Sequence, residues 1–243
     1  MDGFDLTTAP PEFQVWGTAV WVCNSYSNLI WLYVYAGMIY RSYKDKSFAM
    51  PLISQCLNIA WEITFGFLYA PDHWLVMLTF QVAVITNCGV IYSAIKYGSR
   101  EWDRSPMIQR HLPWLYIGGV LLALAGHLTA TAELGETRAC FMNAIVCQVI
   151  LSVGYVGQLL VRGHTRGFSL HLWFFRFTGS LTLVPEFYLR IKYWPEVFGF
   201  LGQPFILWCC YMYLGFDLAY PVLFWYIRKR EKEDELAKGL KEK

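Results

Sequence analysis

Long apolar runs separated by short polar connections dominate this chain. A helix needs about 20 residues to cross the hydrocarbon core of a bilayer, and seven of the runs reach that length. They cover approximately residues 17–40, 49–70, 74–95, 112–132, 139–161, 168–189 and 197–227. The pattern therefore predicts an all-α membrane protein built as a bundle of seven transmembrane helices.

The residues outside these runs are few and leave no room for a second domain. We expect a single transmembrane domain over residues 1–227, followed by a charged cytoplasmic tail over residues 228–243. The N-terminal stretch MDGFDLTTAPPEFQ is acidic and lacks the basic flank of a cleavable signal peptide. The first apolar run is therefore expected to act as an uncleaved membrane anchor.

The composition supports a membrane protein over a soluble one. Of the 243 residues, 56% are hydrophobic and only 16% are charged, whereas soluble domains average about 25% charged residues. The formal net charge is only +2, and we expect neither a nucleic-acid partner nor an obligate protein partner. The seven cysteines form no CxxC pair, and we interpret them as small hydrophobic residues rather than disulfide partners or metal ligands.

The positions of the basic residues predict how the bundle is oriented. Sixteen of the 20 Lys and Arg residues fall in the connections and tail on one side of the predicted bundle, and three fall on the other side. Arg176 is left within an apolar run. Because cytoplasmic loops carry an excess of Lys and Arg, the N-terminus is predicted to be outside or lumenal and the C-terminus cytoplasmic.

Two carboxyl groups, those of Glu62 and Asp217, lie deep within apolar runs. A carboxyl group in hydrocarbon is costly, so such a residue usually marks a site of chemistry or transport. At ~1.5 Å per residue, Glu62 lies about 20 Å from the cytoplasmic end of its helix and Asp217 about 16 Å from the end of its own. The two carboxyl groups would meet at similar depth if their helices were neighbours. Glu133 and Glu186 are expected near the outer helix ends, within reach of water or head groups.

Polar and aromatic residues recur at helical spacing around these two acids. The periodicity predicts a polar pocket, walled with aromatic side chains, in the interior of the bundle. The residues on these faces are Gln55, Asn58, Glu62 and Tyr69 in the second run, Tyr213, Asp217, Tyr220 and Phe224 in the seventh, and Asn24, Asn28, Trp31 and Tyr35 in the first.

Other polar residues in the runs have simpler interpretations. An isolated Asn or Gln in a membrane helix usually hydrogen-bonds to a neighbouring helix, and this applies to Asn24, Asn87 and Gln148. His127 is interpreted as an interior histidine whose hydrogen bonds are satisfied. Arg176 either neutralises Asp217 in a buried ion pair or takes part in function. The sequence has no Cys/His cluster with metal-ligand spacing, so we expect no metal and no other cofactor.

A buried acid in an aromatic pocket suits chemistry that passes through a carbocation. Loss of hydration favours the neutral form of a carboxyl group, which can then act as a general acid. Aromatic faces attract cations by ~0.5–2 kcal/mol each without offering a nucleophile that would trap them. The pattern therefore permits cationic cyclisation of a polyene that enters from the bilayer.

Several ordered motifs resemble one family over nearly the whole chain except the tail. They are MDGFD, APPEF, NIAWEI at 58–63, EWDRSPMIQRHLPW at 101–114, GHLTATAELG at 126–135, YWPE at 193–196 and LGFDLAY at 214–220. The chain resembles the small integral-membrane terpene cyclases of fungal meroterpenoid and indole-diterpene biosynthesis. This resemblance implies cyclisation of a lipophilic prenyl substrate with a terminal epoxide, without a metal and without loss of pyrophosphate. It also implies a multi-pass protein of the endoplasmic reticulum membrane.

The family's two required acids correspond to Glu62, in the Trp61-Glu62 pair, and to Asp217. We hypothesise that Glu62 protonates the epoxide oxygen while Asp217 holds, orients or reprotonates Glu62 or acts as a late base, with the reverse assignment open. The candidates for contact with the substrate or its cations are Trp61, Asn58, Tyr213, Tyr220 and Arg176. The chain contains no Asp-Asp pair, and so lacks the DDxxD and DxDD motifs of other terpene cyclases. Alternative functions are a sterol-isomerase-like membrane enzyme and a seven-helix transporter of a small lipophilic or ionic substrate.

Overall fold

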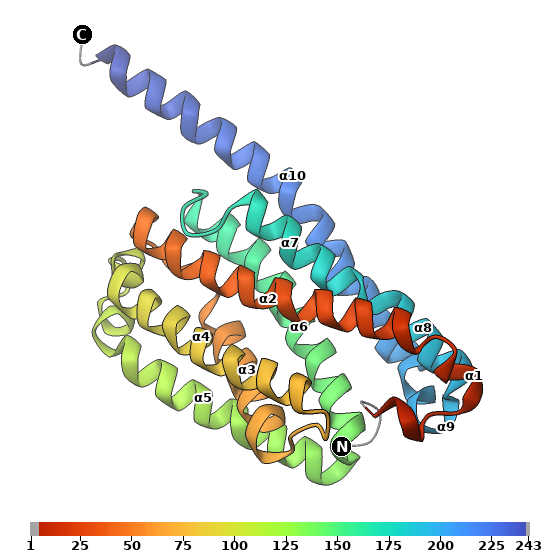
Figure 1. The fold of residues 1–243 in the computed structure, drawn as a ribbon. Helices are drawn as coiled ribbons and strands as arrows, with labels where there is room; N and C mark the ends of the chain where they lie inside the picture. The colour runs from red at the N-terminus through yellow and green to blue at the C-terminus, as the bar shows by residue number, and fades with distance from the viewer. Residues whose placement is uncertain (1–4, 242–243) are drawn as a thin grey trace.

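The computed structural model describes residues 5–241, which form helices and connections without a β-strand (Figure 1). The long helices are α2 (Gly17–Asp45), α3 (Leu52–Ile63), α4 (Trp74–Gly98), α5 (Pro106–Leu134), α6 (Glu136–Arg162), α7 (Leu170–Leu181), α8 (Leu183–Tyr193) and α10 (Pro204–Lys241). The short ones are η1 (Leu6–Thr8), α1 (Pro11–Gln14), the π-helical η2 (Thr64–Leu68), η3 (Ser99–Trp102), α9 (Pro195–Phe198) and η4 (Gly199–Gly202). The all-α prediction is confirmed.

Four of the described helices are long and apolar enough to cross a membrane. They run over Trp74–Trp102, Pro106–Leu134, Glu136–Arg162 and Pro204–Ala237, and a shorter apolar helix covers Leu52–Leu68. Helix α2 has a comparable length of 29 residues but is rich in Asn, Ser and Tyr. The segment from α7 to α8 is interrupted at Thr182, because Pro185 lacks an N–H and its ring conflicts with the carbonyl group one turn earlier. The count of seven spans stays a prediction.

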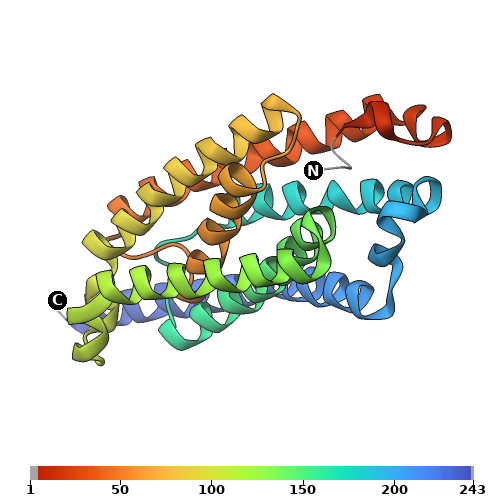
Figure 2. The same cartoon turned by 90° about the horizontal axis from the view of Figure 1, so that it is seen from below.

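Helix α3 occupies the middle of the bundle. In the view from below, α2 and α4 lie on one side and α5, α6 and α10 on the other, with α3 between them (Figure 2). Helix α3 packs against α4, α5 and α6, whereas α10 packs along α6 and against α7. Gly66, in η2, allows close packing on α4, because a Cβ there would lie 3.1 Å from the Cβ of Phe80. A polar residue on α3 is therefore enclosed by helices from both sides.

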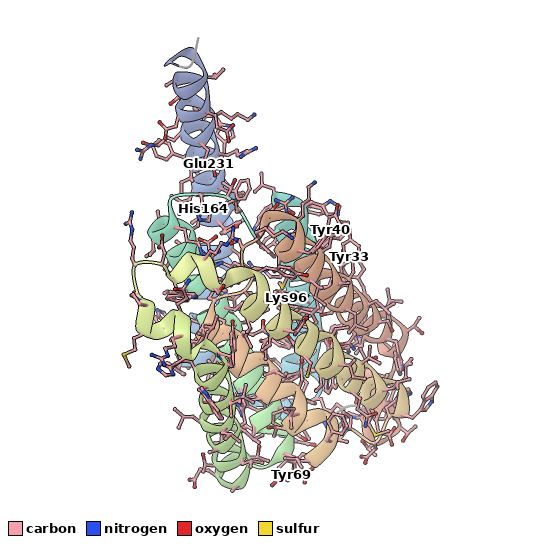
Figure 3. All side chains as sticks on the ribbon, turned by 90° about the vertical axis from the view of Figure 1, so that its left-hand side faces the viewer. Tyr33, Tyr40, Tyr69, Lys96, His164 and Glu231 are labelled. Carbon is pink, nitrogen blue, oxygen red and sulfur yellow. The ribbon has the colours of Figure 1, made fainter. Side chains whose placement is uncertain are left out.

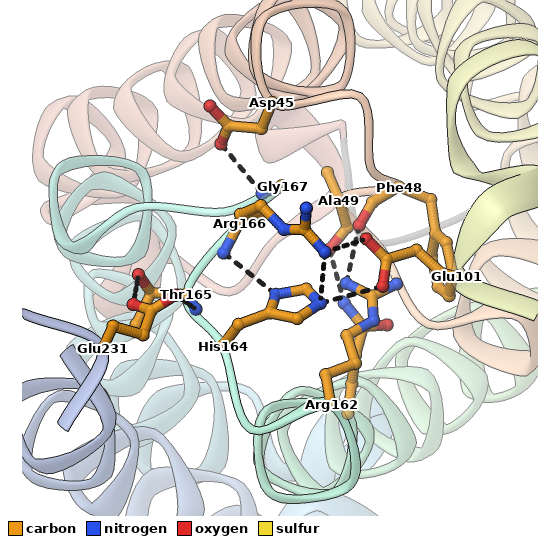
Figure 4. A network of polar contacts seen from close by, with 11 residues as sticks. Asp45, Phe48, Ala49, Glu101, Arg162, His164, Thr165, Arg166, Gly167 and Glu231 are labelled. Carbon is orange, nitrogen blue, oxygen red and sulfur yellow. Dashed lines mark hydrogen bonds and ion pairs between the residues drawn. The ribbon is translucent and has the colours of Figure 1, made fainter. Parts of the chain in front are cut away.

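The connections assigned to the cytoplasmic side meet at one end of the bundle. His164 and Glu231 lie toward that end and Tyr69 at the opposite end (Figure 3). The loop between α6 and α7 is tied to several other elements by hydrogen bonds and ion pairs (Figure 4). The bonds join Gly167 N to Asp45 Oδ2 at 2.9 Å, His164 Nε2 to Glu101 Oε2 at 2.8 Å and Thr165 Oγ1 to Glu231 Oε2 at 2.6 Å. The grouping agrees with the distribution of basic residues, while the orientation in the membrane stays a prediction.

Candidate active site

A cavity of about 190 Å³ lies inside the bundle. Helices α2, α3, α4, α6, α7, α8 and α10 all contribute to its wall, which is mostly apolar and rich in aromatic side chains. Four of the seven candidate site residues line this cavity: Asn58, Trp61, Glu62 and Tyr213. The face predicted in the first apolar run, with Asn24, Asn28, Trp31 and Tyr35, lines it as well. Of the polar face predicted for the second apolar run, Asn58 and Glu62 line the cavity, whereas Gln55 and Tyr69 do not.

Glu62 is the centre of a buried hydrogen-bond cluster at the cavity wall. Glu62 is only 4% exposed to solvent. Tyr35 donates its hydroxyl proton to Glu62 Oε1 at 2.7 Å, and Asn87 Nδ2 donates to Glu62 Oε2 at 2.6 Å. Behind these, Asn58 Nδ2 donates to Tyr35 Oη at 2.7 Å and Gln55 Nε2 donates to Asn87 Oδ1 at 2.5 Å. Every bond in the cluster is donated toward Glu62, and all four partners are neutral side chains.

The local sequence of α3 explains how this cluster forms. Gln55, Asn58 and Glu62 are spaced by three and four residues and therefore share one face of the helix. Trp61 lies beside them, donates its Nε1–H to the carbonyl oxygen of Cys140 at 3.0 Å and meets Phe80 edge-on. The tryptophan ring is thereby held between α6 and α4 at the cavity wall. The π-helical turn η2 follows directly after this face, as is common near functional sites.

Asp217 has a different environment. Arg176 Nη2 donates to Asp217 Oδ1 at 2.5 Å, and both side chains are buried. Pro221 has no N–H to offer the carbonyl oxygen of Asp217 one turn earlier in α10. Trp173 fills that role by donating its Nε1–H to this oxygen at 2.8 Å. The interpretation of Arg176 as the ion-pair partner of Asp217 is confirmed.

The sequence left open whether the two acids meet, and the structure gives each of them its own partners. Asp217 is not among the residues that line the cavity, and its ion pair joins α10 to α7. The reason is the packing order: α6 contacts both α3 and α10, and each acid finds its partners on its own side. Equal depth along two helices therefore did not bring their side chains together.

Arg176 and Tyr220 also lie outside the cavity wall. The Arg176 guanidinium carbon lies 4.9 Å from the ring centroid of Tyr155. Tyr220 packs edge-on against Tyr155 and Phe168, with ring centroids 6.0 Å apart in both pairs. Their predicted contact with a substrate or its cations stays a prediction.

The expectation that water or lipid head groups reach Glu186 is wrong, because its side chain is buried. The residue is 2% exposed, lines the cavity, and accepts a hydrogen bond from Arg190 Nε at 2.7 Å.

Tyr35 and Asn87 are the other site residues that the sequence-based selection missed. Tyr35 was noted only as part of an aromatic face, and Asn87 was interpreted as an interhelical contact. His127 is buried with Nε2 at 3.1 Å from the carbonyl oxygen of Leu57, so its interpretation as a satisfied interior histidine is confirmed.

Comparisons with known proteins identify the family of this chain. The family model of Pyr4-like transmembrane terpene cyclases matches residues 4–230. Terpene cyclase janB of Penicillium janthinellum is 40% identical over 241 residues, which cover 99% of each chain. Terpene cyclase penB of Penicillium crustosum is 40% identical over 243 residues and the whole of both chains, and terpene cyclase atmB of Aspergillus flavus is 40% identical over 234 residues, 96% of each chain. The resemblance seen in the sequence motifs is therefore confirmed, and the chain belongs to the Pyr4-like transmembrane terpene cyclases.

Proposed function

We propose that this protein cyclises a prenylated substrate by protonating its terminal epoxide, with Glu62 as the general acid. The observation that carries the proposal is the setting of Glu62, a buried carboxyl group at the wall of an aromatic cavity with neutral hydrogen-bond partners only. Family membership favours this function over the sterol-isomerase-like and transporter alternatives.

The hydrogen bonds around Glu62 suit an acid that gives up its proton. With no cationic partner in an apolar interior, a carboxyl group favours its neutral form. Tyr35 and Asn87 both donate to the carboxyl oxygens, so neither of these bonds uses the acid proton. Once the proton has moved, the same two donors stabilise the carboxylate. The cluster therefore lowers the free energy of the state that follows protonation.

The proposed reaction is balanced as an isomerisation. The Glu62 proton moves to the epoxide oxygen, the C–O bond breaks, and the π electrons of the neighbouring alkene form the first new C–C bond. Further alkenes repeat that step until a base removes a carbon-bound proton and leaves a double bond. Trp61, Phe80 and Tyr213 line the cavity and offer π faces to the moving positive charge.

Asp217 acts in this proposal as a positioning residue. Its ion pair with Arg176 joins α10 to α7, and Tyr213, one turn earlier in α10, reaches the cavity wall. Tyr220 contributes to the aromatic packing beside that ion pair. The protein would act within the endoplasmic reticulum membrane as a seven-helix bundle with a cytoplasmic C-terminus, receiving its lipophilic substrate from the bilayer.

The proposal is tested by incubating membranes that contain the protein with an epoxyprenyl aromatic substrate, once in H2O and once in D2O. We expect a product of unchanged mass and new retention time, with no carbon-bound deuterium, because the solvent-derived proton ends on a hydroxyl oxygen. A product that carries one carbon-bound deuterium would indicate protonation of an alkene and would contradict the epoxide mechanism. Absence of any cyclised product from a panel of chain lengths would contradict the cyclase function itself.

A further inference from the structure

Glu186 forms a second polar position in the cavity wall, contributed by α8. Its Oε1 accepts the hydrogen bond from Arg190, while its Oε2 is buried and has no hydrogen-bond partner among residues 5–241. A buried carboxylate oxygen without a partner is costly, because the group has lost its hydration and gained nothing in return. Since Glu186 lines the cavity, a ligand in the cavity is in a position to supply the missing donor.

The neighbours of Arg190 keep it in place beside Glu186. Its guanidinium carbon lies 4.4 Å from the ring centroid of Phe198, 5.2 Å from that of Phe141 and 5.6 Å from that of Phe13. Arg190 is 1% exposed and the ion pair spans one helical turn. An ion-paired carboxylate accepts hydrogen bonds and has no proton to donate. Glu186 is therefore an acceptor, in contrast to the acid proposed at Glu62.

One face of α2 connects the two polar positions. Asn24, Ser27, Asn28, Trp31 and Tyr35 all line the cavity and follow each other at helical spacing. Tyr35 contacts Glu62, whereas Asn24 also borders a smaller pocket together with Arg190. Eleven residues separate Asn24 from Tyr35, which corresponds to about 16 Å along the helix. The cavity thus has an acid end at Glu62 and an acceptor end at Glu186.

We infer that the acceptor end binds the head group of the prenylated substrate through an N–H or O–H donor that hydrogen-bonds to Glu186 Oε2. This inference rests on the proposed cyclase function and adds to it the residue that binds the head group. The two ends orient the substrate, because the epoxide oxygen needs a proton donor and the head group needs an acceptor. Asn24 and Asn28 add amide groups beside the same end. A substrate in the reversed orientation would place its epoxide against a carboxylate that cannot protonate it.

Three substrates distinguish the effect of the head group's hydrogen-bond donor from the effect of its size. The first is an indole that carries an epoxidised prenyl chain, the second its N-methyl analogue, and the third an analogue with the methyl group on C7, the benzene-ring CH position nearest to the N–H group. The last keeps the N–H and adds the same volume. With the wild-type protein we expect the N-methyl analogue to raise KM about ten-fold or more, because it leaves the buried acceptor unpaired, while kcat changes little. The C7-methyl analogue should behave like the parent compound.

Variants of the protein test the same hydrogen bond by changing its acceptor instead of its donor. Glu186→Gln leaves Arg190 buried without its carboxylate, so the double variant Glu186→Gln/Arg190→Met is measured with it as a charge-balanced form. In the double variant the difference in KM between the parent and its N-methyl analogue should disappear. Glu196→Gln serves as the matched control, because Glu196 is an exposed carboxylate at the same end of the bundle.

The outcomes distinguish this inference from the proposed function. Turnover of the parent and the N-methyl analogue with equal KM would overturn the head-group assignment and leave the cyclase function intact. An equal loss with both methyl groups would also overturn it, because the cavity would then select for size rather than for a donor. If the wild-type protein converted none of the three, the proposed function would fail and the head-group inference with it.

Discussion

The environments of Glu62 and Asp217 differ in two respects, the charge of their hydrogen-bond partners and their access to the cavity. Both carboxyl groups are buried in helices of an apolar bundle. Glu62 accepts hydrogen bonds from Tyr35 and Asn87, which carry no charge, and lines a cavity. Asp217 is paired with a guanidinium group and does not line that cavity. Burial alone therefore does not distinguish the two acids; the charge of their partners and access to the cavity do, and both features support the proposed acid role of Glu62.

The ion pair at Asp217 is an anchor between helices. Asp217 Oδ2 and two guanidinium nitrogens of Arg176 have no hydrogen-bond partner among the described residues. A buried pair that is only partly satisfied contributes little net stability, yet losing one partner leaves an uncompensated charge. The two regions should consequently respond to substitution in opposite ways: activity is lost at Glu62, and stability is lost at the Asp217 pair.

Glu62→Gln should have the largest effect on turnover. The amide keeps the size of the side chain and still accepts a hydrogen bond, but it has no acidic proton, so the rate should fall about 10²- to 10⁴-fold. Product formation per mole of folded protein is measured by liquid chromatography with mass spectrometry, and gel filtration in detergent reports folding. Glu133→Gln, at an exposed carboxylate on α5, is the control and should retain full activity. A Glu62→Gln variant that stays within a few-fold of the wild type would remove Glu62 from the acid role.

Arg176→Met should have the largest effect on stability. It leaves the Asp217 carboxylate buried without a counter-charge, which is expected to lower the free energy of unfolding by about 3–5 kcal/mol. The double variant Arg176→Met/Asp217→Leu removes both charges and should recover most of that loss. The free energies are measured by titrating the micelle-solubilised protein with SDS. A double variant as unstable as the single one would show that the pair itself, and not the orphaned charge, stabilises the bundle.

Tyr35→Phe is expected to have a moderate effect. It removes the donor to Glu62 Oε1 and the acceptor of Asn58, and a net loss of about 1–1.5 kcal/mol in transition-state stabilisation corresponds to roughly ten-fold in kcat. Tyr33→Phe is a control on the same helix, since Tyr33 is exposed and contacts His171 instead. Equal kinetics in both variants would contradict a role for the donated hydrogen bond.

Parts of this site could be predicted from the sequence. The site residues that the sequence analysis missed were missed for one common reason, which is that their contacts depend on how the helices pack. Helical spacing identified the polar face of α3, because residues on one helix are related by simple geometry. Tyr35 and Asn87 come from α2 and α4, so recognising their contact with Glu62 requires the packing order of the helices. The pairing of Glu186 with Arg190 was readable from their spacing of four residues, but their burial depends on the surrounding aromatic rings of other elements. The family's motifs indicated that Asp217 matters without indicating how.

The smallest predicted effect concerns the backbone of Asp217. Trp173 donates to its carbonyl oxygen, which Pro221 leaves without the usual intrahelical donor, so Trp173→Phe should cost about 0.5–1.5 kcal/mol of stability. Pro221→Ala restores an N–H at that position of α10. The Trp173 substitution should therefore cost much less in the Pro221→Ala background, and the coupling free energy from the double-mutant cycle should approach the cost of the single Trp173 substitution. A coupling near zero would mean that Trp173 stabilises α7 against α10 through ring packing alone, and that the helix tolerates an unpaired carbonyl group beside the ion pair.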